Sequence, residues 1–379
     1  MQRFRPETPA QVVDAVQTAL TEHRPLEVLG LGSKCGIGKP PVQTDVLDLS
    51  LLTGILSYDP AELVLTARAG TPLSQIEFAL SEANQHFAFE PFQPRSLLGT
   101  QDQTLGGMLA AGLAGPRRIS AGSVRDHVLG FAAVSGRGEA FKAGGKVVKN
   151  VTGFDLSKLM AGSWGTLAVL TEVTFKTLPR PETEATLAVP NMTDTEVMKF
   201  LSDAMGSPAE VSGTAFADGR ALVRLEGIAP SVAYRADLVK ALSPGPVEML
   251  DQAASRATWA AIRDGAALAN IQGVIWRISC PPTQGLALVA ALRQETPAKA
   301  VLDWQGGLIW LALPDPVADR LRVLLTQHGG GHATLIRADE STRRATACFQ
   351  PQGTALAALT ARVKTAFDPE GILNPGRME

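Results

Sequence analysis

The sequence has 379 residues, a formal net charge of -2 and 45% apolar residues, which is typical of a globular protein with two domains. The near-neutral charge argues against a nucleic-acid partner held on a basic face. Its three cysteines, Cys35, Cys280 and Cys348, are too dispersed for a disulfide framework, a cysteine metal site or a four-thiolate iron–sulfur cluster. We expect no membrane-spanning segment and no signal peptide, and therefore a cytoplasmic protein.

The first part of the chain predicts a small lobe that contains a βαβ unit. Thr8 is the expected N-cap of its first helix, because Pro9 follows at the first helical position and Gln11 completes a capping box. The sequence 70–72 repeats this capping pattern before a second helix. The elements expected up to residue 83 are helices at 9–22 and 73–83 and strands at 26–29, 46–49 and 63–67.

Glycines are dense between Gly99 and Gly165. Glycine costs backbone entropy on folding, so this density predicts positive φ angles or a close approach of the backbone to a ligand. Backbone amides in such loops can point at phosphate oxygens, as in sites for large anionic cofactors. A run of tight turns in a β-rich domain is the alternative. Strands are expected at 128–134, 140–141 and 166–178, with helices that begin near residues 105 and 155.

A proline-punctuated polar linker at 178–184 separates this region from a part of different texture. Segment 221–226 alternates like a strand with one exposed face. The pattern predicts an antiparallel sheet covered by helices. Its expected strands are 221–226, 276–279 and 308–313, and its expected helices lie around 197–201, 284–293 and 316–327.

The sequence Gly30-Leu31-Gly32 follows a predicted strand but does not make a dinucleotide-binding fingerprint. That fingerprint needs a third glycine at the start of a helix, and here Pro40 and Pro41 forbid an immediate long helix. The loop instead offers backbone amides, the Ser33 hydroxyl and the Lys34 ammonium. It predicts a pyrophosphate-binding loop, with a plain turn as the alternative.

A series of motifs in this order resembles the FAD-binding domain of the vanillyl-alcohol oxidase superfamily, the PCMH-type fold. The motifs are Gly30-Leu31-Gly32-Ser33-Lys34, Ala69-Gly70-Thr71-Pro72-Leu73, Thr104-Leu105-Gly106-Gly107, Gly122-Ser123-Val124-Arg125-Asp126 and Gly162-Ser163-Trp164-Gly165-Thr166-Leu167. The tail 367–376 resembles the C-terminal signature of flavin-linked 2-hydroxy-acid dehydrogenases. Segment 144–155 is most similar to that of the FAD-binding subunits of bacterial glycolate oxidases.

The resemblance implies an α+β protein with three parts. A two-lobed PCMH-type FAD-binding domain is expected at 1–180 and an antiparallel-sheet α/β cap domain for the substrate at 181–365. The tail 366–379 is expected to return to the FAD domain.

The resemblance also implies where FAD would bind. The pyrophosphate would lie over the loops 30–34 and 104–107, and residues 112–126 and 149–155 would lie near the rest of the cofactor. Arg125 and Lys149 would offset phosphate charge or stabilise reduced flavin, with a surface ion pair such as Arg125–Asp126 as the alternative. The expected cofactor-binding residues are Gly30, Leu31, Gly32, Ser33, Lys34, Gly70, Thr71, Thr104, Leu105, Gly106, Gly107, Gly112, Ser123, Arg125, Asp126, Lys149, Asn150, Val151, Gly153, Asp155, Gly165 and Thr166.

Members of the superfamily that attach flavin covalently use a histidine in the first loop or a cysteine in the second. Here Lys34 and Cys35 occupy the first loop, and no cysteine occurs at 99–125. Free cysteine is more often a small buried apolar residue than a reactive group. We therefore expect non-covalent FAD.

Oxidation of a 2-hydroxy acid needs a cation for the carboxylate and a base for the hydroxyl proton, while FAD accepts the hydride. The second part of the chain offers Arg277 or Arg337 as the carboxylate clamp, since arginine binds carboxylates bidentately. His332, in the glycine-rich segment 329–337, is the candidate base. An ordinary loop histidine is the alternative.

The resemblance implies the FAD-binding subunit of a glycolate oxidase complex, with a sister FAD-linked 2-hydroxy-acid dehydrogenase subunit and an iron–sulfur subunit as partners. Glycolate or D-lactate would be the substrate, and the complex would lie in the cytoplasm or peripherally on the inner membrane. Related subunits carry the segment His-x-Gly-Asp-Gly-Asn-x-His, which this chain lacks, so we expect no metal site and little independent turnover. The alternatives are a self-sufficient 2-hydroxy-acid dehydrogenase and a structural subunit that only holds flavin.

Overall fold

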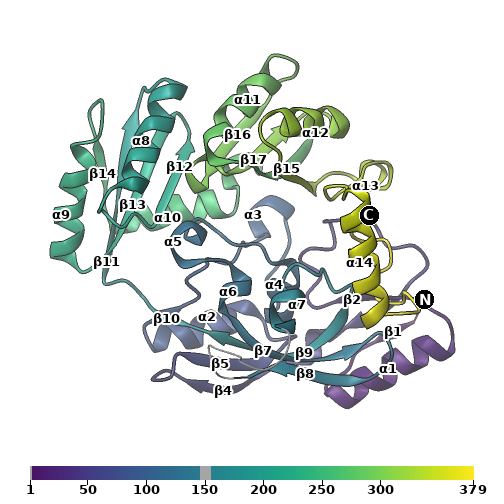
Figure 1. The fold of residues 1–379 in the computed structure, drawn as a ribbon. Helices are drawn as coiled ribbons and strands as arrows, with labels where there is room; N and C mark the ends of the chain where they lie inside the picture. Colours follow the sequence, from purple (N-terminus) through teal and green to yellow (C-terminus); the bar gives the residue numbers. More distant parts are fainter. Residues whose placement is uncertain (1, 146–154) are drawn as a thin grey trace. The chain divides into compact units, whose positions relative to one another are not determined.

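The computed structural model describes residues 2–145 and 155–379. The chain divides into two compact units (Figure 1). Unit 1 comprises Met1–Leu113, Gly122–Pro179 and Pro351–Glu379, and unit 2 comprises Ala114–Ala121 and Arg180–Gln350. Two divisions differ from those expected from the sequence. Residues 114–121 group with unit 2, and the return to unit 1 begins at residue 351 instead of 366, because a helix and the tail both pack there.

Unit 1 begins with a small parallel sheet in the order β1-β3-β2. The helix α1 begins as predicted: the Thr8 side chain accepts the Gln11 N–H, and the Gln11 side chain accepts the Thr8 N–H. These elements are β1 (Arg3–Phe4), α1 (Pro9–Thr21), β2 (Leu26–Leu29) and β3 (Asp45–Asp48).

A second, antiparallel sheet of unit 1 has the order β4-β5-β9-β7-β8. Val12 and Val16 of α1 share a buried core with Val134 and Val169 of this sheet and Leu47 of the parallel sheet. The strands are β4 (Ile55–Asp59), β5 (Val64–Arg68), β7 (Val128–Ser135), β8 (Ala140–Gly144) and β9 (Ala168–Lys176), while β6 (Gln85–His86) pairs with β10 (Leu178–Pro179). The helices are α2 (Leu73–Glu82), α3 (Arg95–Leu98), α4 (Leu105–Ala111), α6 (Val124–His127), α7 (Leu156–Met160) and α14 (Thr354–Phe367).

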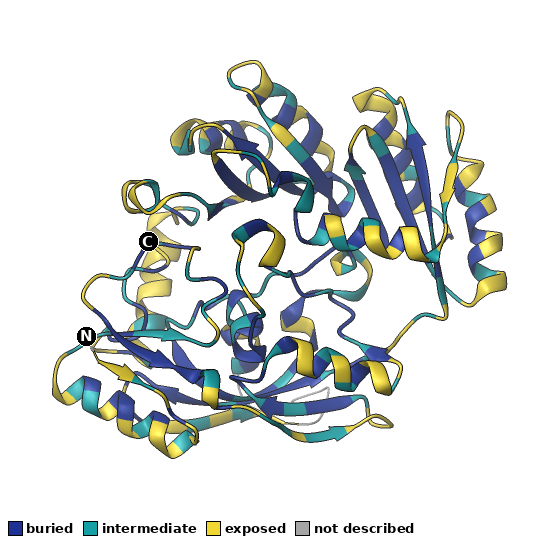
Figure 2. Ribbon diagram, turned by 180° about the vertical axis from the view of Figure 1, so that it is seen from behind, coloured by how far each residue is buried: buried dark blue, intermediate teal, exposed yellow. Residues whose placement is uncertain are grey.

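Unit 2 is an eight-stranded antiparallel sheet in the order β14-β11-β13-β12-β16-β17-β15-β18. Trp276 and Ile278 on one face share a core with Phe200, Leu288 and Leu321 of three covering helices, and Figure 2 shows mostly buried strands under helices with exposed outer surfaces. The strands are β11 (Thr183–Pro190), β12 (Gly213–Ala217), β13 (Arg220–Gly227), β14 (Glu248–Leu250), β15 (Val274–Ser279), β16 (Lys299–Asp303), β17 (Leu308–Leu313) and β18 (His332–Arg337). The helices are α5 (Arg118–Ala121), α8 (Asp194–Gly206), α9 (Ala229–Lys240), α10 (Gln252–Arg263), α11 (Gly285–Arg293), α12 (Ala318–Gln327) and α13 (Glu340–Ala345).

Three local expectations from the sequence were wrong. Strand β13 has no exposed face, because Val223 and Leu225 lie in the core on one side and Arg224 on the other side is buried with its guanidinium carbon 4.6 Å from the Trp259 ring. Helix α2 has no side-chain cap; the Thr71 hydroxyl donates to Arg68 O instead. The glycine-rich segment 329–337 is not a loop throughout, since β18 begins at His332.

Candidate functional site

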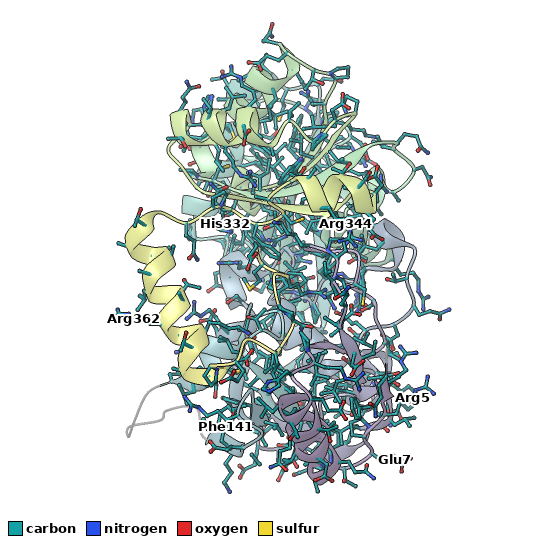
Figure 3. All side chains as sticks on the ribbon, turned by 90° about the vertical axis from the view of Figure 1, so that its right-hand side faces the viewer. Arg5, Glu7, Phe141, His332, Arg344 and Arg362 are labelled. Carbon is teal, nitrogen blue, oxygen red and sulfur yellow. The ribbon has the colours of Figure 1, made fainter. Side chains whose placement is uncertain are left out.

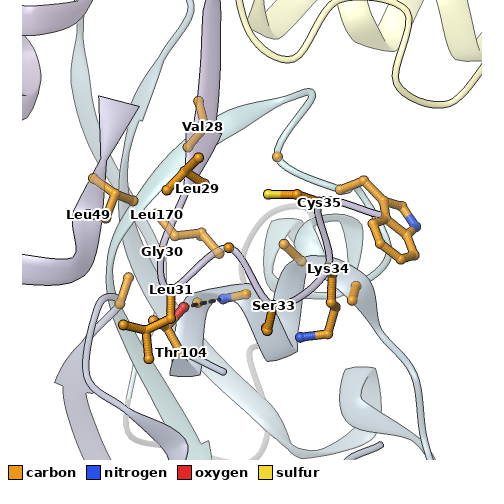
Figure 4. A pocket seen from close by; sticks show the side chains of 18 of the residues that line it. Val28, Leu29, Gly30, Leu31, Ser33, Lys34, Cys35, Leu49, Thr104 and Leu170 are labelled. Carbon is orange, nitrogen blue, oxygen red and sulfur yellow. Dashed lines mark hydrogen bonds between the residues drawn. The ribbon is translucent and has the colours of Figure 1, made fainter. Parts of the chain in front are cut away.

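A partly open pocket in unit 1, with a cavity volume of about 100 Å³, lies at the end of β2. Its walls come from the loop that follows β2, the start of α4, the segment around Trp164 and the chain near the C-terminus (Figure 4). The lining residues include Gly30, Leu31, Gly32, Ser33, Lys34, Cys35, Thr104, Gly106, Gly107, Trp164, Gly165 and Arg377.

The loop after β2 needs its glycines. A Cβ on Gly30 would lie 2.5 Å from Thr104 Oγ1, and Gly32 has a φ of +70°, which L side chains rarely adopt. Ser33 is buried, and its carbonyl accepts the Thr100 hydroxyl at 3.1 Å. The loop therefore approaches α4 closely and presents backbone and one hydroxyl to the pocket.

Lys34 supplies a buried amine to this pocket. Only 8% of the residue is exposed, and its Nζ donates to Gln103 Oε1. Burial, reinforced by the positive charge of Arg377, lowers the pKa of Lys34 to about 7, against the opposing effects of Asp102 and Cys35. An anion in the pocket would favour the protonated amine.

The start of α4 forms the facing wall. The Thr104 hydroxyl accepts the Gly107 N–H at 3.1 Å (dashed in Figure 4) and caps the helix. A Cβ on Gly106 would lie 2.8 Å from Ala69 Cβ, so this glycine serves close packing of α4 on the chain after β5 and has no positive φ. Leu105 is buried beneath the helix.

Other expected cofactor residues make internal contacts of unit 1. A Cβ on Gly70 would lie 1.9 Å from Leu49 O, and one on Gly112 would lie 2.9 Å from Gly162 N, so both glycines allow backbone to approach backbone. The Thr71 hydroxyl also accepts the Gly54 N–H. The Thr166 hydroxyl donates to Ser163 O, while neighbouring Gly165, with a φ of +69°, lines the pocket.

Ser123 and Asp126 form the capping box of α6. The Ser123 N–H and hydroxyl both donate to Asp126 Oδ2 at 2.7 Å. These hydrogen bonds and the nearby His127 and Arg125 outweigh desolvation and lower the pKa of Asp126. The structure thus gives this pair a structural role beside Arg125, which is exposed.

Four expected residues, Lys149, Asn150, Val151 and Gly153, lie outside the described residues. Asp155 is described: it caps α7 by accepting the Lys158 N–H, and its carboxylate pairs with the Lys158 ammonium at 3.0 Å.

A second candidate site lies on the β15–β17–β18 part of unit 2. Arg277 is buried, its guanidinium carbon lies 5.0 Å from the Trp304 ring and 5.5 Å from the Trp310 ring, and its Nη2 donates to Ala114 O at 3.2 Å. Its Nε has no hydrogen-bond partner among the described residues. Burial and the charge of Arg118 lower the pKa of Arg277 to about 10 although Asp303 opposes them. A buried cation with an unused donor suits an anionic ligand.

His332, labelled in Figure 3, is the first residue of β18. Strand β18 pairs with β15, which carries Arg277. His332 is paired with Ser279, and since residues two apart on a strand share a face, His332 and Arg277 lie on the same face of the sheet. Loss of solvation lowers the pKa of His332, with further contributions from Arg277 and Arg118. The neutral ring, which can accept a proton, is therefore favoured.

The structure does not place the Arg337 guanidinium with Arg277 and His332. Its guanidinium donates to three backbone carbonyls, those of Leu268, Ala269 and Ile271. Arg337 therefore anchors the segment before β15, and we do not retain it as the carboxylate clamp. The sequence did not single out Arg118 or Trp304, whose guanidinium carbon and ring lie 4.7 Å apart.

The described residues contain no group of three or more His, Cys, Asp or Glu side chains placed to hold a metal ion. Within the same ranges, no helix has the length and apolar character needed to cross a membrane.

The residues of the unit 1 pocket fit the pyrophosphate of a dinucleotide. Glycines bring the backbone close to the space, Thr104 and Gly107 line it, and the buried Lys34 supplies an amine.

Comparison with known proteins agrees with this fit. A family model described as an FAD binding domain matches residues 2–144. A solved structure of p-cresol methylhydroxylase with substrate bound superposes with a TM-score of 0.74 at 15% identity, over 99% of this chain and 88% of that one. The fold is therefore the expected PCMH-type α+β fold, and the protein is an FAD-linked flavoprotein.

Two curated proteins narrow the class. The chain is 37% identical over 368 residues to the glycolate oxidase subunit GlcE of Escherichia coli strain K12. The aligned region covers 97% of this chain and 96% of that protein. It is 34% identical over 178 residues to the glycolate oxidase subunit GlcD of Bacillus subtilis strain 168, over 46% of this chain and 36% of that protein. The chain belongs to the GlcE family of glycolate oxidase subunits. The predicted FAD cofactor and oxidoreductase class are confirmed.

Proposed function

We propose that this chain is the FAD-binding subunit of a complex that oxidises glycolate to glyoxylate. The observation that carries the proposal is the unit 1 pocket, which is lined by Lys34 and the rest of loop 30–34, here called the glycine loop. The chain that forms this pocket is similar to GlcE along almost its whole length. A sister FAD-linked 2-hydroxy-acid dehydrogenase subunit and an iron–sulfur subunit would complete the complex. The name of the GlcD relative supports the first partner.

In this proposal the residues of unit 1 bind and orient the cofactor. The amides of loop 30–34 and the Lys34 amine would hold the pyrophosphate, and Thr104 and Gly107 would form the facing wall. Bound FAD supplies the capacity to accept a hydride and to pass electrons on. The complex would work in the cytoplasm or peripherally at the inner membrane.

The buried Arg277, with Trp304, Trp310 and His332 around it, favours a second candidate function, in which this chain oxidises a 2-hydroxy acid by itself. Arg277, held between Trp304 and Trp310, would bind the substrate carboxylate. His332, kept neutral by its surroundings, would accept the hydroxyl proton. Its lowered pKa makes it a weaker base, and its ring lies at the exposed start of β18.

Omission of this chain from a reconstituted complex tests the proposed function. The complete complex should reduce an artificial electron acceptor with glycolate, and the same preparation without this chain should lose at least about 100-fold of that rate, as expected when a whole cofactor site is missing. D-Lactate serves as the second substrate. Full activity without this chain would contradict the proposal.

A further inference from the structure

The C-terminal segment, residues 368–379, is held by hydrogen bonds of the Asp368 carboxylate and of the main chain of β2. The Asp368 carboxylate accepts the N–H groups of Ile372 and Leu373 at 3.0 and 2.9 Å and the Lys364 ammonium. The N–H of Leu26, the first residue of β2, donates to Ile372 O at 2.7 Å. The segment therefore runs beside the strand that leads into the glycine loop of the pocket.

Asn374 joins two walls of that pocket. Its Oδ1 accepts the Val28 N–H at 2.8 Å, and its Nδ2 donates to Trp164 O at 2.9 Å. Val28 and Trp164 both line the pocket. One buried amide thus fixes the spacing between β2 and the segment around Trp164.

Arg377 is hydrogen-bonded to the glycine loop. It is 9% exposed, lines the pocket, and donates from Nη2 to Lys34 O at 2.7 Å. Its guanidinium carbon lies 5.8 Å from the Trp164 ring. Arg377 therefore fixes the backbone of Lys34, which lines the pocket, and its positive charge acts on the Lys34 amine.

We propose that the C-terminal segment forms part of the FAD site: Asn374 and Arg377 are positioning residues that hold the loop 30–34 in its binding geometry, and Arg377 is a second cation of the site. A loop held in its bound geometry before the ligand arrives loses less conformational entropy on binding. The inference rests on the placement of the pyrophosphate over residues 30–34. Its test measures binding, so it is distinct from the test of glycolate oxidation.

The proposal predicts a particular pH dependence. The groups that face Lys34 are Arg377, which disfavours its charged form, Asp102 and Cys35, which favour it, and the neutral Gln103 amide. The pyrophosphate favours the protonated amine. FAD affinity should therefore be constant below about pH 7 and weaken above it, because binding then requires uptake of a proton.

The experiment titrates apoprotein with FAD between pH 6 and pH 9, following quenching of flavin fluorescence. Arg377→Gln should bind FAD about tenfold or more weakly at pH 6, since a charge-assisted hydrogen bond and a cation are lost. The pH at which affinity begins to fall should move upward, because Lys34 no longer has a cation beside it. Arg362→Gln, which removes an exposed cation from α14 (Figure 3), should match the wild type in both respects.

The shift in pH separates positioning from a general loss of structure. A folded Arg377→Gln protein in which the affinity falls at the same pH as in the wild type overturns the proposal. If that variant is insoluble, Arg377→Lys decides: it keeps the charge but not the guanidinium that reaches Lys34 O. It should bind FAD more weakly at pH 6 while its affinity falls at the same pH as in the wild type, and wild-type affinity would overturn the proposal.

Discussion

Arg277 and Arg337 lie on neighbouring strands but have opposite environments. Arg337 donates to three backbone carbonyls, while the buried Arg277 donates to one carbonyl and leaves its Nε without a partner among the described residues. A buried charge with few hydrogen bonds costs stability, and an anionic ligand would supply the acceptor for Nε. At the scale of single residues, the unsatisfied group is the functional candidate and the satisfied one is structural.

This contrast predicts opposite effects on the free energy of unfolding. Arg337→Met should lower it by about 1–3 kcal/mol, because three partly buried carbonyls lose their donor. Arg277→Met should leave it equal to or above the wild-type value, because a poorly paired buried charge is replaced by an apolar side chain. Urea unfolding of the three apoproteins measures both effects. A larger loss for Arg277→Met than for Arg337→Met would contradict this assignment.

Lys34 predicts a pH dependence of stability. Its pKa is about 7 in the folded protein against 10.5 ordinarily, so both states are protonated below pH 7 and only the unfolded state keeps the proton between these values. The free energy of unfolding should therefore rise with pH in that window, by up to about 1.4 kcal/mol per unit. In Lys34→Met this rise should be absent. Unfolding of both apoproteins at pH 6.5 and 8.5 measures the difference, and parallel behaviour would refute it.

The first loop also predicts the mode of flavin attachment. Lys34 and Cys35 occupy it, and it contains no histidine. Acid precipitation of the holoprotein should leave the yellow chromophore in the supernatant. Colour that stays in the pellet would show a covalent bond, and its loss in Cys35→Ser would locate it.

At the scale of elements, the glycine motif at the start of α4 has two roles: it lines the pocket, and it lets the helix pack closely on Ala69. The sequence indicated that Thr104, Gly106 and Gly107 border the cofactor, and the first of these does cap the helix at the pocket wall. The reason for Gly106 was not visible in the sequence, because its neighbour Ala69 is distant along the chain. Contacts of this kind depend on tertiary structure.

Gly106→Ala separates the two reasons. Helix propensity alone would make alanine more stable by about 1 kcal/mol, but its Cβ would meet Ala69, and overpacking typically costs about 1–3 kcal/mol. The steric term should win and lower the melting temperature of the apoprotein. Gly36→Ala is the matched control, since a Cβ there meets nothing within 4 Å. An unchanged or raised melting temperature for Gly106→Ala would show that α4 can shift away.

At the scale of the whole molecule, the sequence predicted local elements well and long-range groupings poorly. Capping and periodicity identified α1, β2 and α4, since these signals are local. Segment 114–121 joins unit 2 through contacts such as that of Ala114 O with Arg277, and Arg377 enters the pocket through a bond to Lys34. The sequence offers no local signal for pairs separated by 163 and 343 residues.

The central claim is that this chain holds FAD but depends on partner subunits for rapid glycolate oxidation. Anaerobic mixing of the FAD-loaded chain alone, with flavin absorbance followed in time, tests it most directly. Dithionite should bleach the flavin completely, whereas glycolate and D-lactate should bleach it slowly or not at all, because the lowered pKa of His332 makes it a weak base and general-base catalysis contributes about 10²–10⁴-fold in rate. Rapid bleaching by glycolate that is lost in His332→Ala would contradict the claim and establish a self-sufficient dehydrogenase.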